Sequence, residues 1–364
     1  MSGIGERVRE SLGQVCPDVL DREVAGRIGM TPDAFSRALG GKRHFSSIEL
    51  ARLSEMLDAD LHWLITGQPD PHRLCVAARH DFDHATGRRA VPGLKGDTQI
   101  LEDIALAYRQ AYPQPGLATS GNWSNSPSIV RESLGIDFIR PFADRLEENF
   151  GIGVVGLPEL TTAYSFTVGG QPVIAIPATG NWFRENWDLA HELGHHVLGH
   201  HADGISKTEA DKHEAAANAF AAELLLPAQI LNGIDWESIS DEDLAARVWE
   251  WGISTDALCR RLKSLTGYVP APVAHWAAGP TQRLLRYHLR IRSELDEITI
   301  RISQAAQRRF PLGLQEAHLE RVASGAISKA TLAWMLGIDA AALEVDSPEI
   351  PEVSADDLAA ALGL

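Results

Sequence analysis

The residues best suited to chemistry lie in one short run, His191-Glu192-Leu193-Gly194-His195. Four residues advance an α-helix by about 400°, so both imidazoles project from one side of a helix, within reach of a single ion. Neutral imidazole is a good zinc ligand, and a carboxylate beside that face can take a proton from a water on the metal. The pattern predicts a Zn²⁺ site in which Glu192 is the catalytic base.

A catalytic zinc site needs a third protein ligand, and two residues compete for this position. His201 stands where an HExxHxxGxxH site places its last histidine, but the position that requires glycine is Leu198, and the methionine turn of such sites is missing. Glu214 lies nineteen residues after His195, on the apolar stripe of the next expected helix. A carboxylate on such a stripe is costly unless it is paired or bound to a metal. We therefore expect the metal ligands to be His191, His195 and Glu214.

The surrounding residues support a metal site over a merely solvated helix. Six of the fourteen histidines lie between His191 and His213, which a random surface rarely shows. Asn218 follows Glu214 by one helical turn, so it lies on the same side and could hydrogen-bond a ligand histidine from outside the coordination sphere.

Two strands and two helices are expected to position these side chains. Tyr164–Val168 and Pro172–Ile176 flank a Gly-Gly turn and predict a hairpin. A helix begins near Asn181 and carries the histidines, and a second helix spans about Thr208 to Leu226. Pro172–Ala178 is the candidate sheet edge that would bind an extended peptide as an added strand, and the alternative is that this strand only packs under the histidine-bearing helix.

The two runs Trp187–His195 and Glu214–Pro227 resemble the ImmA/IrrE-type metallopeptidases, in which AHELGH is followed by ExxANxFAxxLLxP. The resemblance covers residues 130–230 and departs from the family at Leu226, where methionine is frequent. It implies a thermolysin-like minimal zinc peptidase core, with zinc on the two histidines and the glutamate. It also implies a protein substrate, since characterised members cleave a helix-turn-helix repressor and thereby switch genes on.

Residues 1–68 predict a compact set of five helices. Asp21–Met30 indicates a helix that ends at a glycine turn, and Thr31-Pro32 begins the next helix with a good N-cap and a proline at the first helical position. This pair resembles the Xre/Cro repressor-type helix-turn-helix. Asp21 departs from that family, which commonly has a DNA-contacting glutamine there. The domain could therefore dock a protein or pair two copies of the chain.

In a domain of this family the second helix enters the major groove of DNA. The resemblance places Ser36 and Arg37 near the bases, and Lys42 and Arg43 near the phosphates. We expect DNA binding, where it occurs, to reside in residues 1–68.

Composition limits the other functions and the compartment. The 33 basic and 49 acidic residues give a net charge of −16, which argues against broad binding to nucleic acids or membrane surfaces. The three cysteines, Cys16, Cys75 and Cys259, form no CxxC pair, so we expect a reduced, cytoplasmic protein. We expect no membrane partner, because no signal peptide and no run of about eighteen apolar residues occur.

The expected fold class is α+β and predominantly helical, and 364 residues are too many for one ordinary core. We expect a helix-turn-helix DNA-binding domain at 1–68, a connecting helical linker at 69–125 and a zinc metallopeptidase core with a small sheet at 126–279. A C-terminal helical region follows at 280–364 and begins with one long helix over 280–308.

The sequence as a whole predicts a gluzincin-like zinc endopeptidase, fused to a DNA-binding domain, that cleaves a helix-turn-helix repressor. The alternative is a non-catalytic transcriptional regulator with a structural or sensory zinc site. Glu192 favours the enzyme, because a structural site has no use for a carboxylate beside an open coordination position. Self-cleavage within Ala85–Gly96, which is rich in glycine and proline, is the nearest rival to repressor cleavage.

Overall fold

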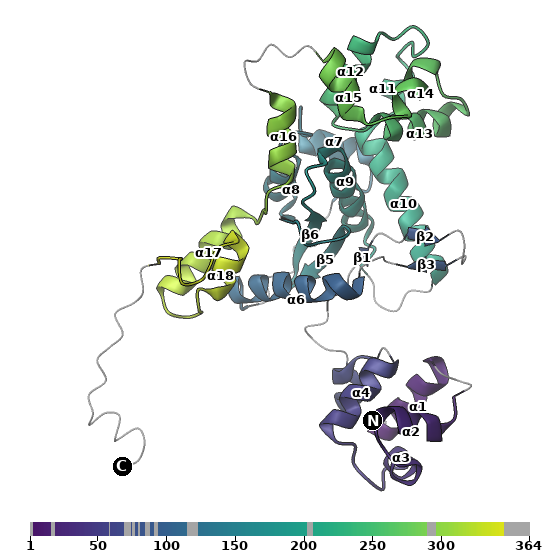
Figure 1. Cartoon of the computed structure of the whole chain (residues 1–364), viewed down its shortest axis with the longest axis vertical. Coiled ribbons are helices and arrows are strands. Elements are labelled where there is room, and N and C mark those ends of the chain that lie inside the picture. The colour runs from purple at the N-terminus through teal and green to yellow at the C-terminus, as the bar shows by residue number, and fades with distance from the viewer. Residues whose placement is uncertain are drawn as a thin grey trace. The chain divides into compact units, whose positions relative to one another are not determined.

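The computed structural model describes residues 3–15, 19–57, 59–68, 74, 77–78, 81–83, 88–90, 94–114, 123–201, 207–289 and 296–345. The chain divides into two compact units, Met1–Arg73 and Leu74–Leu364 (Figure 1). The described residues are predominantly helical with small sheets, which confirms the α+β class. Cys16, Cys75 and much of Ala85–Gly96 lie outside the described residues.

The N-terminal unit contains five helices in its described part: α1 (Ile4–Val15), α2 (Asp21–Ile28), α3 (Pro32–Leu39), α4 (Ser47–Leu57) and α5 (Leu61–Thr66). The local signals act as the sequence predicts. Gly29 ends α2 in the left-handed region at φ 81°, and the side chain of Thr31 accepts a hydrogen bond from the backbone N–H of Ala34 to begin α3. The helices surround a core that includes Val24, Phe35 and Leu53.

The main sheet has the strand order β1-β5-β6-β4. Its members are β1 (Ala77–Ala78), β4 (Gly153–Leu157), β5 (Tyr164–Val168) and β6 (Gln171–Pro177). β5 and β6 form the expected antiparallel hairpin, β4 pairs with β6 in parallel, and β1 pairs with β5. A separate ribbon joins β2 (Asp81–Asp83) to β3 (Arg88–Ala90).

The expectation that Pro172–Ala178 is a sheet edge is wrong. β6 lies between β5 and β4, so both sides of its backbone are paired. The physical reason is visible in its residues, since Val173–Ile176 is a continuous apolar run that is buried on both faces of the sheet. The strand next to the edge is β5, whose outer side carries β1 opposite Tyr164 and Ser165.

Helices cover both faces of this sheet. On one face, Val154, Ile174 and Ile176 share a core with α7 (Pro127–Leu134), α8 (Phe142–Phe150), α9 (Trp182–Leu198) and α10 (Lys207–Leu225). On the other face, Val173 and Ala175 pack with α6 (Leu94–Ala111), α17 (Leu312–Ala323) and α18 (Ala330–Leu336). α9, which carries the histidines, therefore lies directly on β5 and β6.

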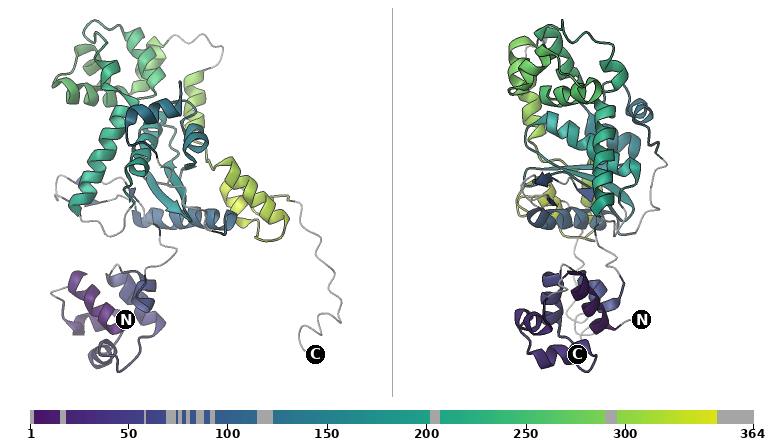
Figure 2. Two further views of the ribbon diagram at one scale, coloured as in Figure 1. Left: turned by 180° about the vertical axis from the view of Figure 1, so that it is seen from behind. Right: turned by 90° about the vertical axis from the view of Figure 1, so that its right-hand side faces the viewer.

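The remaining helices gather beyond α10 (Figure 2): α11 (Ala228–Leu231), α12 (Asp241–Trp251), α13 (Thr255–Thr266), α14 (Ala271–Ala277) and α15 (Thr281–His288). The expected single helix over 280–308 is wrong. α15 ends where Leu289 turns extended, and Asp296 caps a new helix, α16 (Glu297–Ala305). No helix among the described residues combines the length and apolar character needed to cross a membrane.

Candidate metal centre

α9 holds the HExxH run in the interior of the larger unit. The side chain of Asn181 caps its start by accepting a hydrogen bond from the backbone N–H of Arg184, and Gly199 ends it at φ 71°. His191, Glu192 and His195 are all buried. The two histidines face the same way, as their spacing predicts, and their Nε2 atoms are 3.2 Å apart.

α10 brings Glu214 to these two rings. Its Oε2 lies 3.5 Å from Nε2 of His191, and its Oε1 lies 3.3 Å from Nε2 of His195. Two atoms that each lie 2.0–2.1 Å from a tetrahedral ion are about 3.3 Å apart, and each imidazole nitrogen stands near that separation from the other and from one oxygen of the Glu214 carboxylate. The buried group His191, His195 and Glu214 could therefore hold a metal ion.

Small residues allow α10 to come so close. A Cβ atom on Gly194 would lie 3.1 Å from the ring of Phe220 and 3.3 Å from the Cα of Ala217. Glycine on α9 and alanine on α10 thus let the helix backbones meet, and this close contact brings the carboxylate of Glu214 to the two histidines.

Burial and neighbours set the charge of Glu214. Burial raises its pKa, but hydrogen bonds from His191 and His195 outweigh that effect and lower the pKa to about 2. Glu214 is therefore ionised at neutral pH, which is the form that binds a cation.

Glu192 lies beside the three ligands and is fully buried. The hydroxyl of Ser165, on β5, donates to its Oε2 at 2.7 Å. Among the described residues, no group donates to the other oxygen, Oε1. Burial raises the pKa of Glu192, while His191, His195 and the Ser165 hydroxyl act in the opposite direction. One oxygen of this buried carboxylate is thus anchored, and the other has no hydrogen-bond donor among the described residues.

His200 is the residue that contacts the outer ring nitrogen of the ligand His195, and no sequence motif predicted it. Its Nδ1 lies 3.1 Å from Nδ1 of His195. Burial, followed by the neighbouring histidines, lowers the pKa of His200 to about 4, so its ring is neutral at pH 7 and one ring nitrogen can accept a hydrogen bond. The ring of His213 stacks on it, with centroids 4.0 Å apart and planes at 4°.

Asn218 does not make this contact. Its side chain is exposed, and its amide donates to the backbone carbonyl of Glu214 at 2.9 Å. His201, the rejected third ligand, stacks on the ring of His196 with centroids 4.4 Å apart, and in the described part of the chain it is not a member of the candidate metal group.

The residues expected to contact DNA have different environments in the N-terminal unit. Ser36, Arg37 and Lys42 are exposed, and Arg37 has an exposed ion pair with Asp33 at 3.8 Å. Arg43 instead donates two hydrogen bonds to Glu49, from Nη1 to Oε2 and from Nη2 to Oε1, both at 2.9 Å.

Hydrogen bonding with Arg43 is the largest effect on Glu49 and lowers its pKa to about 2. Arg43 therefore forms an ion pair with a residue in the first turn of α4.

Residues 147–263 match the family model of a peptidase family described as the IrrE N-terminal-like domain. The matched span runs from the end of α8 to α13 and contains His191, Glu192, His195 and Glu214. This match supports an ImmA/IrrE-type peptidase and a metallopeptidase-type function for this part of the chain. No curated protein and no solved structure matches the chain.

Proposed function

We propose that the chain is a zinc-dependent endopeptidase in which His191, His195 and Glu214 hold the metal and Glu192 is the general base. The observation that carries the proposal is that the two imidazole Nε2 atoms lie 3.2 Å from each other and 3.3 and 3.5 Å from the carboxylate oxygens of Glu214, with the buried carboxylate of Glu192 beside them. One imidazole pair and one carboxylate are the ligand set of catalytic zinc sites that keep an open position.

A zinc ion held by these residues would polarise the scissile carbonyl and lower the pKa of a bound water to about 7. Glu192 accepts a proton from the attacking water on its free Oε1, while Ser165 holds Oε2. The C–O bond forms first by addition of the water to the scissile carbonyl, and the C–N bond breaks after Glu192 has passed the same proton to the departing amine. His200 accepts the Nδ1–H of His195, which keeps Nε2 of His195 deprotonated and directed at the metal.

An extended peptide would reach this centre along the outer edge of β5. In the described part of the chain, β1 pairs with Tyr164 and Ser165 of this edge, and the substrate would add as a strand beside β5. A folded helix already uses its backbone donors, so the cleaved segment is an exposed linker between elements.

We propose further that the substrate is a helix-turn-helix repressor and that residues 1–68 are a DNA-binding helix-turn-helix domain. The sequence resemblances support both ideas, and α2 and α3 meet at the Gly29 turn as such a pair requires. A chain that carries a repressor-like domain meets other repressors on shared DNA or by domain pairing, which raises the local concentration of substrate.

The substrate proposal is tested by mass spectrometry of the products formed by zinc-loaded wild type and by Glu192→Gln, each with purified repressors encoded near its gene. We expect repressor fragments from wild type only, cut in a linker. Fragments of the chain itself and of no repressor would replace this proposal with self-cleavage. No fragments at all would favour a non-catalytic regulator with a structural or sensory zinc.

A further inference from the structure

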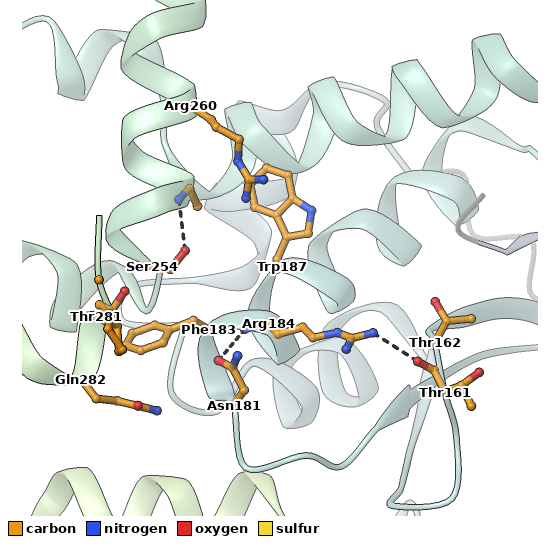
Figure 3. Close-up of a pocket in the computed structure, with 13 residues that line it drawn as sticks. Thr161, Thr162, Asn181, Phe183, Arg184, Trp187, Ser254, Arg260, Thr281 and Gln282 are labelled. Atoms are coloured by element: carbon orange, nitrogen blue, oxygen red, sulfur yellow. Dashed lines mark hydrogen bonds between the residues drawn. The ribbon is translucent and has the colours of Figure 1, made fainter. Parts of the chain in front are cut away.

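A pocket of about 600 Å³ opens beside the N-terminal half of α9 (Figure 3). Three parts of the larger unit line it: the loop between β4 and β5 at Thr161 and Thr162, the first turns of α9, and the helices beyond α10. Trp187 and Phe183 form its apolar wall, and Arg184 and Arg260 supply its charge. None of these residues belongs to the candidate metal centre.

The pocket lies close to the candidate metal centre along α9. Trp187 precedes His191 by four residues and so lies on the same side of α9, about 6 Å along the helix axis. Thr162 precedes Ser165 by three residues on the segment that enters β5, and Ser165 donates to Glu192. Extended chain rises about 3.3 Å per residue, so a peptide at the metal centre reaches the pocket within about two or three residues of the scissile bond.

The charge of the lining is entirely positive. Among the described residues that line the pocket, the ionisable side chains are Arg184 and Arg260, and none is a carboxylate. The other polar groups are neutral, such as the Asn181 amide and the Thr162 and Ser254 hydroxyls. In a chain whose net charge is −16, this lining favours an anionic group over a cationic one.

The two arginines differ in how they are held. Two hydrogen bonds hold the guanidinium of Arg184. Its Nε donates to the buried carboxylate of Asp188 at 3.3 Å, and its Nη2 donates to the carbonyl of Thr161 at 3.3 Å. Arg260 pairs with Asp256 at 2.9 Å, but the two side chains are 71% and 58% exposed. An ion pair this exposed contributes little, so Arg260 can exchange its partner for an incoming carboxylate.

We propose that this pocket is a specificity subsite that binds a glutamate or aspartate side chain of the substrate, two or three residues from the scissile bond, through Arg260. The inference rests on the proposed peptidase function. Trp187 and Phe183 pack against the methylene groups of the bound side chain, and Arg184 adds a fixed positive charge at the base. A planar guanidinium can bind a carboxylate through two parallel hydrogen bonds, which the ammonium group of lysine cannot form.

The test uses full-length zinc-loaded protein and sets of extended decapeptides that carry glutamate, glutamine or lysine at one position and a fixed sequence elsewhere. We expect wild type to cleave the glutamate peptides at about tenfold higher kcat/KM than the glutamine peptides, as a charged hydrogen bond provides. Arg260→Glu should reverse this order in favour of lysine. Lys263→Glu introduces the same charge change on the same helix but outside the lining, and it should leave the preference unchanged.

Binding of the same peptides to Glu192→Gln, measured by fluorescence anisotropy, gives a readout that does not depend on turnover. Equal affinity for the three peptides, or a preference that Arg260→Glu does not alter, would overturn the subsite. Succinate serves as a free carboxylate. Arg260-dependent succinate binding without any peptide preference would also overturn it, because the pocket would then serve a free anion. Peptide preference in binding with no cleavage by wild type would support the subsite and contradict the proposed catalysis.

Discussion

Individual residues of the metal centre differ in how far sequence alone can identify them. His191, Glu192 and His195 follow from a spacing within one helix, and Glu214 follows from a carboxylate on an apolar stripe. Ser165 and His200 could not be predicted, because their contacts join separate elements or depend on how the chain turns after Gly199. One signal was present in the case of Ser165, which is a small polar residue between the buried aromatic residues Tyr164 and Phe166.

We predict that His200→Ala weakens zinc binding by about 10- to 100-fold, as loss of a hydrogen-bond partner of a metal ligand typically does. His195 would lose the acceptor that fixes its tautomer. His200→Asn restores an acceptor and should recover part of the affinity, whereas His201→Ala, which removes a nearby ring outside the metal group, should change nothing. Competition with a chelator measures all three variants. Equal affinity in His200→Ala and wild type would show that His200 only fills space.

The hydroxyl of Ser165 has a predictable effect on the pH profile. Its hydrogen bond stabilises the charged form of Glu192 and lowers that residue's pKa, so Ser165→Ala should raise it. Because Glu192 accepts a proton only when it is ionised, the acidic limb of kcat/KM should move to higher pH. Thr167→Ala, which changes an exposed side chain on the same strand, is the control. An acidic limb that stays in place, or moves to lower pH, would contradict the proposed role of Ser165.

Among the elements, local signals were sufficient for α2, α3, α9 and the β5–β6 hairpin, but not for the break between α15 and α16 or for the order of strands. Gly29, Thr31 and the Gly-Gly turn act through neighbouring residues, so their effects can be read directly. β4 pairs with β6 although β5 lies between them in the sequence, so no local signal specifies this pairing. The continuous apolar run of β6 was the available evidence that this strand is central.

The contact between α9 and α10 should be sensitive to one methyl group. We predict that Gly194→Ala destabilises the protein by about 1–3 kcal/mol, the usual effect of overpacking, and lowers zinc affinity because Glu214 moves away with α10. Gly313→Ala is the matched control, since a Cβ there meets nothing within 4 Å. Urea unfolding and metal analysis measure the two effects. A Gly194→Ala protein as stable and as metal-rich as wild type would show that the close approach does not position the ligand.

At the scale of the whole molecule, the chain divides after Arg73, and the two units carry different candidate functions. The larger unit contains the candidate metal centre and the pocket beside α9 that is lined by Arg184 and Arg260. The smaller unit presents Arg37 and Lys42 to solvent, while Arg43 is engaged with Glu49. DNA recognition by this unit is an expectation from its resemblance to repressor domains, and it has its own prediction.

We predict that DNA binding resides in residues 1–68 and falls steeply with salt, because phosphate contacts release counterions. Lys42→Ala should weaken binding to all sequences alike, whereas Arg37→Ala should relax sequence preference. Arg43→Ala should mainly destabilise the domain, since it leaves Glu49 unpaired. Gel retardation at several salt concentrations, with thermal unfolding, separates these effects. Failure of the isolated domain to retard any DNA at low salt would favour a protein-docking module.

The most direct test of the proposed peptidase function compares peptide-bond cleavage by wild type and Glu192→Gln at equal, measured zinc content. The substitution is nearly isosteric and leaves the three ligands intact, so both proteins should bind one zinc per chain. Only the basicity of the side chain is lost, and removal of a general base typically slows a reaction by about 10²–10⁴-fold. We therefore expect full zinc occupancy in both proteins and a fall in kcat of that size in the variant. Undiminished cleavage by zinc-loaded Glu192→Gln would contradict the assignment of Glu192 as the base.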